Sequence, residues 1–285
     1  MKLSCPDFSW PLLEHRHALS LITMLGVEGL DLGLFGNRSH VRPETVREDI
    51  PLWAGVLSER IARAGLELAD FFAQAWTEPE VLAVNHPDPR QHDDAWAFFV
   101  DMLELAHRLG TPGMTLLPGV RFGDEPWEAS IQRSADALKG RLDAAAVHGI
   151  TLSVEGHVGS NVDTPEKLAR LIELTPGLQL TLDYTHFIYA GFTDADVEPL
   201  LEHARHVHCR GGAPGRLQTS FAENVIDYSR ILQRLRERAY PGYVGLEYVW
   251  SDWLDCTRSD TLSETILFRD FARATIAGSD VVPVV

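Results

Sequence analysis

Four residues that can bind a metal ion or move a proton each follow a short apolar segment in the second half of the chain. Glu155 lies in TLSVEGH, Asp183 in LTLDYTH, His208 in HVHCRGG and Glu247 in VGLEYVW. The intervals between them each accommodate one helix and the next strand. In a closed parallel barrel the carboxyl ends of the strands meet on one face, so we expect these side chains to converge. Three carboxylates and one imidazole would form a site for a single divalent cation.

The two glutamates give the strongest support to this metal hypothesis. The alternative for Glu155 and Glu247 is a charged side chain that faces solvent beside a strand. An unpaired carboxylate buried at the end of a barrel strand costs several kcal/mol, so both residues need a cation. Asp183 alone would also suit a helix cap or a turn. His206 and His208 share one side of their strand, and His208 is the better ligand because it lies nearer the carboxyl end.

Other residues near these positions are candidates for binding a substrate. His157 follows Glu155 closely, His186 follows Asp183, and Arg216 lies in the loop after the His208 strand, where a guanidinium could hold a substrate oxygen. Simple solvent exposure is the alternative for each of the three. Aromatic residues in loops on the same predicted face would form an apolar wall for a sugar ring; they are Trp10, Phe35, Trp127, Phe187, Trp250 and Trp253.

Short apolar segments alternate with longer amphipathic ones along the whole chain. Such alternation favours a parallel sheet with helices outside it, and eight units in 285 residues predict one (β/α)8 TIM barrel domain over residues 1–285. The glycine-rich stretch 211–215 is interpreted as a flexible loop. Strands are predicted over 2–5, 27–32, 66–71, 113–117, 151–154, 178–182, 206–209 and 244–247, and helices over 12–25, after 43, 93–109, 126–148, after 164, 194–203, 228–238 and 260–276.

Composition excludes several kinds of partner and chemistry. The net charge of −16 would repel nucleic acid and anionic membranes. The sequence has no run of about 18 apolar residues and no apolar segment of the signal-peptide kind at its start, so a cytoplasmic protein with three reduced cysteines is expected. The three lysines fall at the terminus or on predicted outer helices, which argues against a Schiff base inside the barrel.

The four motifs also resemble those of a known superfamily. VEGH at 154–157, LDYTH at 182–186, HVH at 206–208 and GLEY at 245–248 resemble the sugar phosphate isomerase/epimerase superfamily of xylose isomerase-like TIM barrels. This group includes ketose 3-epimerases, hydroxypyruvate isomerases, inosose dehydratase and endonuclease IV. The resemblance implies that Glu155, Asp183, His208 and Glu247 bind one divalent ion, manganese first, with magnesium, cobalt or zinc as alternatives. It also implies catalytic proton transfer by Glu155 and Glu247, and a homodimer or homotetramer.

The reaction expected from this resemblance is isomerisation or epimerisation of a small sugar or keto-polyol through a metal-stabilised enediolate. The alternatives are a dehydratase or lyase of the inosose or 3-dehydroshikimate type, or a 3-keto-glycoside-cleaving enzyme. Many relatives continue the motif around His208 as His-Leu-Lys-Asp, whereas this chain has Arg210 in place of the lysine and lacks the aspartate. The additional ligand motifs of endonuclease IV and xylose isomerase are absent, which argues for one metal. DNA repair is opposed by the net charge, and sugar binding without turnover by the pair of glutamates.

Overall fold

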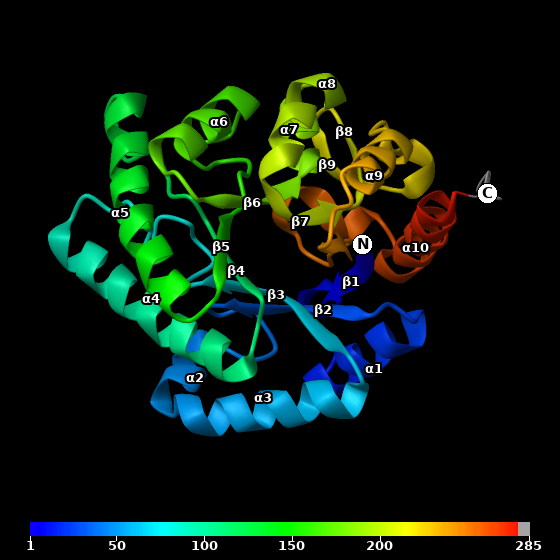
Figure 1. Ribbon diagram of the computed structural model, residues 1–285, viewed down its shortest axis with the longest axis horizontal. Coiled ribbons are helices and arrows are strands. Elements are labelled where there is room, and N and C mark those ends of the chain that lie inside the picture. The colour runs from blue at the N-terminus through cyan, green and yellow to red at the C-terminus, as the bar shows by residue number, and fades with distance from the viewer. Residues whose placement is uncertain (279–285) are drawn as a thin grey trace.

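The computed structural model describes residues 1–278, and its main sheet is a closed barrel (Figure 1). Every neighbouring pair of barrel strands is parallel, and β1 pairs with both β2 and β10. The predicted (β/α)8 barrel is therefore confirmed, while the last seven residues of the expected 1–285 domain lie outside the described part. The barrel strands are β1 (Lys2–Pro6), β2 (Gly29–Phe35), β3 (Glu67–Gln74), β4 (Gly113–Leu116), β5 (Thr151–Val154), β6 (Gln179–Asp183), β7 (Ala204–Cys209) and β10 (Tyr243–Leu246).

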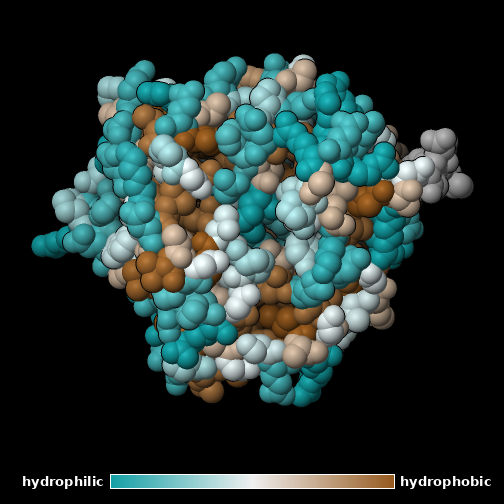
Figure 2. All heavy atoms as spheres, viewed as in Figure 1, coloured by the Kyte–Doolittle hydropathy of each residue, from teal (hydrophilic) through white to brown (hydrophobic). Residues whose placement is uncertain are grey.

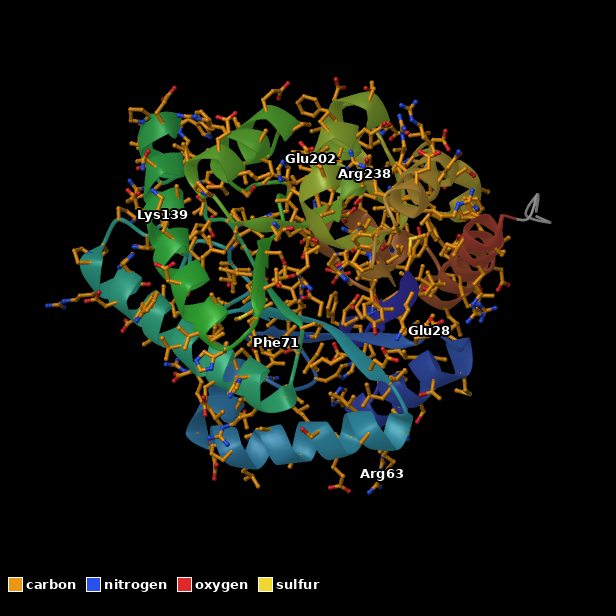
Figure 3. The ribbon with its side chains drawn as sticks, viewed as in Figure 1. Glu28, Arg63, Phe71, Lys139, Glu202 and Arg238 are labelled. Atoms are coloured by element: carbon orange, nitrogen blue, oxygen red, sulfur yellow. The ribbon has the colours of Figure 1, made fainter. Side chains whose placement is uncertain are left out.

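Helices surround the barrel and connect its strands (Figure 1). Figure 3 shows Arg63 on the side of its helix that faces away from the barrel. Within residues 1–278, none of the helices has the combination of length and apolar character needed to cross a bilayer. The α-helices are α1 (His15–Leu25), α2 (Pro43–Glu48), α3 (Ile50–Ala64), α4 (Pro89–Leu109), α5 (Trp127–Val147), α6 (Pro165–Leu174), α7 (Tyr184–Tyr189), α8 (Asp194–Val197), α9 (Tyr228–Glu237) and α10 (Thr261–Ala277).

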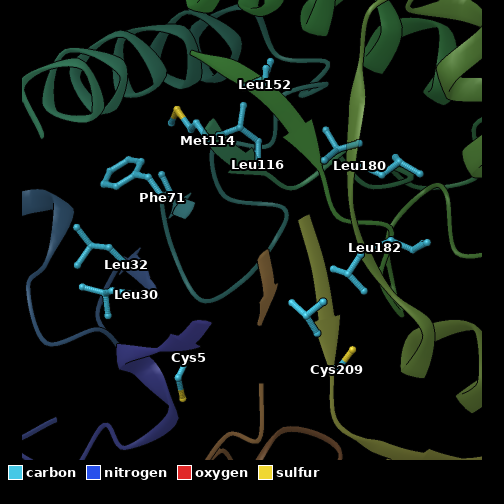
Figure 4. Close-up of a cluster of buried hydrophobic side chains, with 14 of the residues drawn as sticks. Cys5, Leu30, Leu32, Phe71, Met114, Leu116, Leu152, Leu180, Leu182 and Cys209 are labelled. Atoms are coloured by element: carbon cyan, nitrogen blue, oxygen red, sulfur yellow. The ribbon is translucent and has the colours of Figure 1, made fainter. Parts of the chain in front are cut away.

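Side chains along each barrel strand alternate between two environments, as strand geometry requires. Leu180 and Leu182 of β6 belong to the large apolar core with side chains of the outer helices, and Figure 4 shows them with similar residues from other strands. Thr181, between them, hydrogen-bonds to Thr115 of β4 at 2.6 Å, inside the barrel. Figure 2 shows apolar residues between the hydrophilic outer helices and the centre of the molecule. The interior of the barrel is thus polar, and its apolar core lies outside the sheet.

A buried ion pair spans the barrel interior toward the amino ends of the strands. Thr181 pairs with His206, while Leu180 pairs with Ala204, so Arg205 is an extra residue in β7. Such a bulge turns a side chain to the other face, and the Arg205 guanidinium donates hydrogen bonds to Asp70 and, at 2.9 Å, to Ser153. Asp70 is fully buried. Arg205 therefore supplies the cation that this carboxylate needs inside the barrel.

Three local features differ from the sequence prediction. The helix expected after Pro43 is two helices, because Asp49 interrupts the first and caps the second through Leu52 N at 3.0 Å. The glycine-rich stretch is not a flexible loop: it contributes to an antiparallel hairpin of β8 (Gly211–Ala213) and β9 (Arg216–Thr219). Gly215 has a φ of +70° at the hairpin turn, which a glycine adopts without strain. No helix was predicted over 184–189, where α7 lies, although Asp183 was considered as a helix cap; its side chain does cap α7 through Thr185 N.

We expect Arg205→Met to lower the free energy of unfolding by about 3 to 5 kcal/mol, because it leaves the buried Asp70 without a cation. Chemical denaturation followed by circular dichroism would measure the change. The matched control is Arg216→Met, which breaks the exposed ion pair with Glu223 and should cost less than about 1 kcal/mol. Equal losses of stability in the two variants would show that the interior ion pair contributes no more than the exposed one.

Candidate metal centre and cavity

The structure brings the four predicted ligands together at the carboxyl end of the barrel. Asp183 ends β6 and His208 lies near the end of β7, while Glu155 and Glu247 directly follow β5 and β10. The backbone of the two glutamates continues the sheet, since Glu155 N donates to Leu116 O at 3.1 Å and Glu247 N donates to Cys209 O at 2.9 Å. No side chain of the four is more than 7% exposed. Regular strand geometry therefore fixes where each functional side chain begins.

Glu155, His208 and Glu247 form one of three groups of possible metal ligands among residues 1–278; a second is described next, and the third consists of Asp31, His206 and His208. His208 Nδ1 lies 2.8 Å from Glu155 Oε1 and 3.4 Å from Glu247 Oε1, and one ligand atom from each residue lies within 4.8 Å of the others. Burial lowers the pKa of His208, but the Glu247 and Glu155 carboxylates raise it more strongly, to about 10. Burial raises the pKa of Glu155, but the hydrogen bond and the charge of His208 bring this pKa below its ordinary value. Imidazole and carboxylates thus stabilise each other's charges.

Asp183, His186 and Glu155 form the second cluster, so Glu155 is common to both. Asp183 Oδ1 accepts hydrogen bonds from Thr185 N at 2.8 Å and Thr185 Oγ1 at 2.7 Å, and Oδ2 accepts from Arg210 Nη2 at 2.7 Å. Burial raises the pKa of Asp183, yet Arg210 and these other neighbours bring it down to about 2. Asp183 is therefore ionised and already paired with a cation supplied by the chain.

Arg210 is the residue at this site whose role the sequence did not establish. Its guanidinium is 4% exposed and lies 2.7 Å from Asp183 and 3.5 Å from Glu247 Oε2. Two buried tyrosines hold the backbone there: Tyr228 Oη donates to Arg210 O at 2.7 Å, and Tyr248 Oη accepts from Gly211 N at 2.9 Å. The Arg210 side chain points inward like those of His206 and His208, because the three residues are each two positions apart along one extended segment. This spacing was the signal in the sequence that could have identified Arg210 as a site residue.

Glu247 is the carboxylate that this arrangement leaves least compensated. Burial raises its pKa to about 8, the negative charges of Glu155 and Asp183 act in the same direction, and His208 and Arg210 only partly oppose them. Within residues 1–278, Oε2 of Glu247 is buried and makes no hydrogen bond. A divalent cation would relieve the repulsion and coordinate this oxygen, so the donor set fits a metal ion of the kind that carboxylates and imidazole bind.

A second layer of polar residues lies beneath His208. Asp31 Oδ2 accepts a hydrogen bond from Ser4 Oγ at 3.0 Å and lies 3.1 Å from His206 Nε2 and 3.9 Å from His208 Nε2. A Cβ atom on Gly245 would lie 2.5 Å from Asp31 Oδ2 and 3.1 Å from the His208 ring. A glycine in β10 is therefore what allows Asp31 and His208 to approach each other. Negative charge behind an imidazole orients it for a metal ion on the other side.

The clusters open into a cavity of about 440 Å³, within the range of small-molecule sites. Phe8, Phe35 and Phe72 form a separate apolar cluster, with ring centroids of Phe8 and Phe35 4.8 Å apart. Among the predicted wall residues, Phe35, Trp250 and Trp253 line the cavity, whereas Trp10, Trp127 and Phe187 do not. Several lining residues were not among the candidates from the sequence; they include Phe8, Arg38, Phe72, Leu117 and Val249. Arg210, noted from the sequence only as standing in place of a lysine, also lines the cavity.

Two of the three predicted substrate contacts lie at the cavity. His157 and His186 line it, and burial lowers the pKa of both, that of His186 to about 4. Both are therefore neutral imidazoles near pH 7. The structure does not bring Arg216 to the cavity: it is half exposed at the start of β9 and pairs with Glu223 at 2.9 Å. The hairpin, absent from the sequence prediction, carries this arginine away from the barrel axis.

In a comparison with known proteins, a family model described as "Xylose isomerase-like TIM barrel" matches residues 20–269. The chain belongs to the xylose isomerase-like TIM barrel family. No curated protein matches it in a sequence comparison.

Several solved structures share the fold of this family member over nearly its whole length. An L-ribulose 3-epimerase is 19% identical with a TM-score of 0.75, covering 97% of this chain and 95% of its own. The IOLI protein, described with a bound zinc atom, is 18% identical with a TM-score of 0.72 and coverages of 99% and 100%. A probable 3-DHS dehydratase, AsbF of Bacillus anthracis, is 15% identical with a TM-score of 0.70 and coverages of 94% and 98%. At such identities the likeness concerns the fold.

For this xylose isomerase-like barrel, we expect Glu247→Gln to stabilise the metal-free protein, and more so above about pH 8 than below about pH 5. The pKa of Glu247 rises from its ordinary 4.5 to about 8 on folding, so the folded protein holds a proton that the unfolded chain releases in this window. Stability from this group therefore falls as pH rises. Glutamine avoids the loss, which should reach about 1 to 3 kcal/mol.

Denaturation curves at several pH values, in the presence of a chelator, would measure this difference. Glu166→Gln is the control, because Glu166 is an exposed residue in the first turn of α6 and should give a nearly constant difference. A Glu247→Gln protein that is less stable than wild type at high pH would contradict the charge imbalance described above.

Proposed function

We propose that this protein is a divalent-metal-dependent isomerase or epimerase of a small sugar or keto-polyol, and that it works by proton transfer. The observation that carries the proposal is a pair of buried carboxylates, Glu155 and Glu247, that both approach Nδ1 of His208 and both line the cavity. Carboxylates so placed suit the removal of a proton from carbon and its return. A structural neighbour with a TM-score of 0.75 is described as an L-ribulose 3-epimerase, which supports the reaction class.

The metal ion would be held by Glu155, Asp183, His208 and Glu247. The donor set is rich in carboxylate oxygens, which favours manganese or magnesium, and its imidazole also suits zinc or cobalt. When bound, the ion would act as a Lewis acid toward the carbonyl and adjacent hydroxyl of the substrate. Asp183 shares a group of possible ligands with Glu155 and is bonded to Arg210, so Arg210 would limit how much negative charge faces the ion.

The chain's own side chains would perform the proton transfers. For epimerisation, one of Glu155 and Glu247 takes the proton from the carbon beside the carbonyl and the other returns a proton to the opposite face. For isomerisation, one carboxylate could serve both steps: it moves the proton to the neighbouring carbon, while the hydroxyl proton passes to the former carbonyl oxygen. His157 Nδ1 lies 2.8 Å from Val158 O and donates to it, which leaves Nε2 as an acceptor for a substrate hydroxyl. His186 Nδ1 accepts from Val158 N at 3.3 Å, which places the hydrogen of the neutral ring on Nε2, 3.5 Å from Asp183 Oδ2. The phenylalanine wall would exclude water from the reacting carbon.

Elimination of water from a keto-polyol is the second candidate. The same removal of a proton beside the carbonyl can be followed by expulsion of a β-hydroxyl, to which a carboxylic acid donates the proton. A neighbour with a TM-score of 0.70 is described as a probable 3-DHS dehydratase, which favours this alternative. The products differ, because elimination gives a conjugated ketone that absorbs in the ultraviolet and epimerisation does not.

We expect metal-loaded wild-type protein in D2O to exchange deuterium into a keto-polyol substrate. Glu155→Gln and Glu247→Gln should each lower the exchange rate by about 10² to 10⁴, the usual contribution of a positioned acid or base. Nuclear magnetic resonance of a panel of ketoses and keto-inositols would follow the exchange, with Glu166→Gln as the exposed control. Exchange that survives in both variants would remove the two glutamates from the mechanism.

We also expect about one manganese ion per chain after reconstitution and removal of excess metal. A ligand at 100 times its dissociation constant stabilises the folded state by about 2.7 kcal/mol, so thermal unfolding should shift upward. His208→Ala and Glu247→Gln should weaken this shift, while His203→Ala should retain it, because His203 lies away from the site at the end of the short helix 198–203. Absence of binding by elemental analysis and of any thermal shift would contradict the metal assignment.

A further inference from the structure

Arg38 lies at the cavity, in the segment that follows β2. The proposed ligands, by contrast, come from the second half of the chain. Arg38 lines the same cavity as Glu155 and Glu247. Its guanidinium lies 5.0 Å from the centroid of the Phe35 ring, a cation–π contact. Phe35 is 2% exposed and packs edge to face on Phe72 at 5.1 Å. The arginine therefore lies over a firmly packed aromatic base.

No carboxylate of the chain pairs with Arg38 within residues 1–278, and its guanidinium makes no hydrogen bond there. A shortage of acids does not explain this, since the chain has 41 acidic and 25 basic residues. Arg210, which lines the same cavity, is by contrast bonded to Asp183. Arg38 is thus a cation at the cavity with its hydrogen-bonding positions available to a ligand.

The surroundings of Arg38 also favour the arrival of a negative charge. Partial removal from water lowers the pKa of the Arg38 guanidinium, the charge of Glu247 opposes this shift, and the nearby Arg210 adds only a small further lowering. An oxyanion from a ligand would compensate for the water that the guanidinium loses at the cavity wall. It would also accept two parallel hydrogen bonds from Arg38, the geometry that arginine gives carboxylates and phosphates.

We propose that the substrate is an anionic keto-polyol, whose carboxylate or phosphate is bound by Arg38 while its reacting carbons lie at Glu155 and Glu247. This assignment rests on the proposed function and names its substrate class. The cavity of about 440 Å³ has room for a sugar chain that extends from the carboxylate pair to Arg38. Arg38 would be a specificity residue, because it contacts a part of the substrate remote from the reacting bond.

The test compares three substrate groups on manganese-loaded full-length protein: neutral ketohexoses, keto-uronates and ketohexose phosphates. The ratio of kcat/KM for anionic over neutral substrates is measured for wild type, Arg38→Gln and Arg42→Gln. Arg42 lies on the same segment, is exposed, and is outside the cavity, so Arg42→Gln makes the same change of charge. We expect Arg38→Gln to lower the ratio about 10- to 100-fold, the value of a charge-assisted hydrogen bond, mainly through KM. Arg42→Gln should leave it unchanged.

Turnover of keto-uronates would assign the anionic group of the substrate as a carboxylate, and turnover of ketohexose phosphates would assign it as a phosphate. A wild-type preference for neutral ketoses, or equal effects of Arg38→Gln and Arg42→Gln, would overturn the proposal. If nothing in the panel exchanges hydrogen, the proposed function fails separately, and calorimetric binding of the same compounds still tests Arg38: binding of an anionic sugar that Arg38→Gln abolishes supports it, and binding indifferent to charge refutes it.

Discussion

The compensation of negative charge inside the barrel is the constraint on which the rest of this structure depends. The strands bury carboxylates at several heights along the axis, and a buried carboxylate persists only beside a cation or strong donors. Asp70 has Arg205, Asp31 has His206, Asp183 has Arg210 and Glu155 has His208. Glu247 is the buried carboxylate that remains after these four pairs are assigned. Burial and the nearby negative charges raise its pKa to about 8. Among the buried carboxylates, Glu247 would therefore gain most from a bound metal ion.

Arg210 changes how the acidic cluster can be used. It divides the carboxylates into a pair beside His208 and a separate Asp183, which the guanidinium and Thr185 hold in place. Arginine remains charged in proteins, so this division persists over the range of pH in which a sugar enzyme works. A metal ion and a fixed guanidinium would together surround the substrate, and the family fold alone would not have required that combination.

The cavity adds specificity to this reactive end. Its walls are aromatic near the barrel, where Phe8, Phe35 and Phe72 pack edge to face, and they carry Arg38 toward the opening. Residues from the amino-terminal part of the chain therefore form much of the cavity wall, while the proposed catalytic residues come from the carboxyl-terminal part. Such a division agrees with a fold in which loops after different strands can vary separately.

The sequence by itself determined the barrel and the positions of Glu155, Asp183, His208 and Glu247, because strand length and alternation are local properties that fix where a side chain leaves the sheet. His157 and His186 were candidates because they follow Glu155 and Asp183 closely in the sequence, and both line the cavity. Only the tertiary structure decided that Arg210 bonds Asp183, that Arg38 lines the cavity and that Arg216 does not. Those outcomes depend on a β-hairpin, on tyrosine hydroxyls from distant segments and on contacts between loops, and such contacts leave no periodic signal in the sequence.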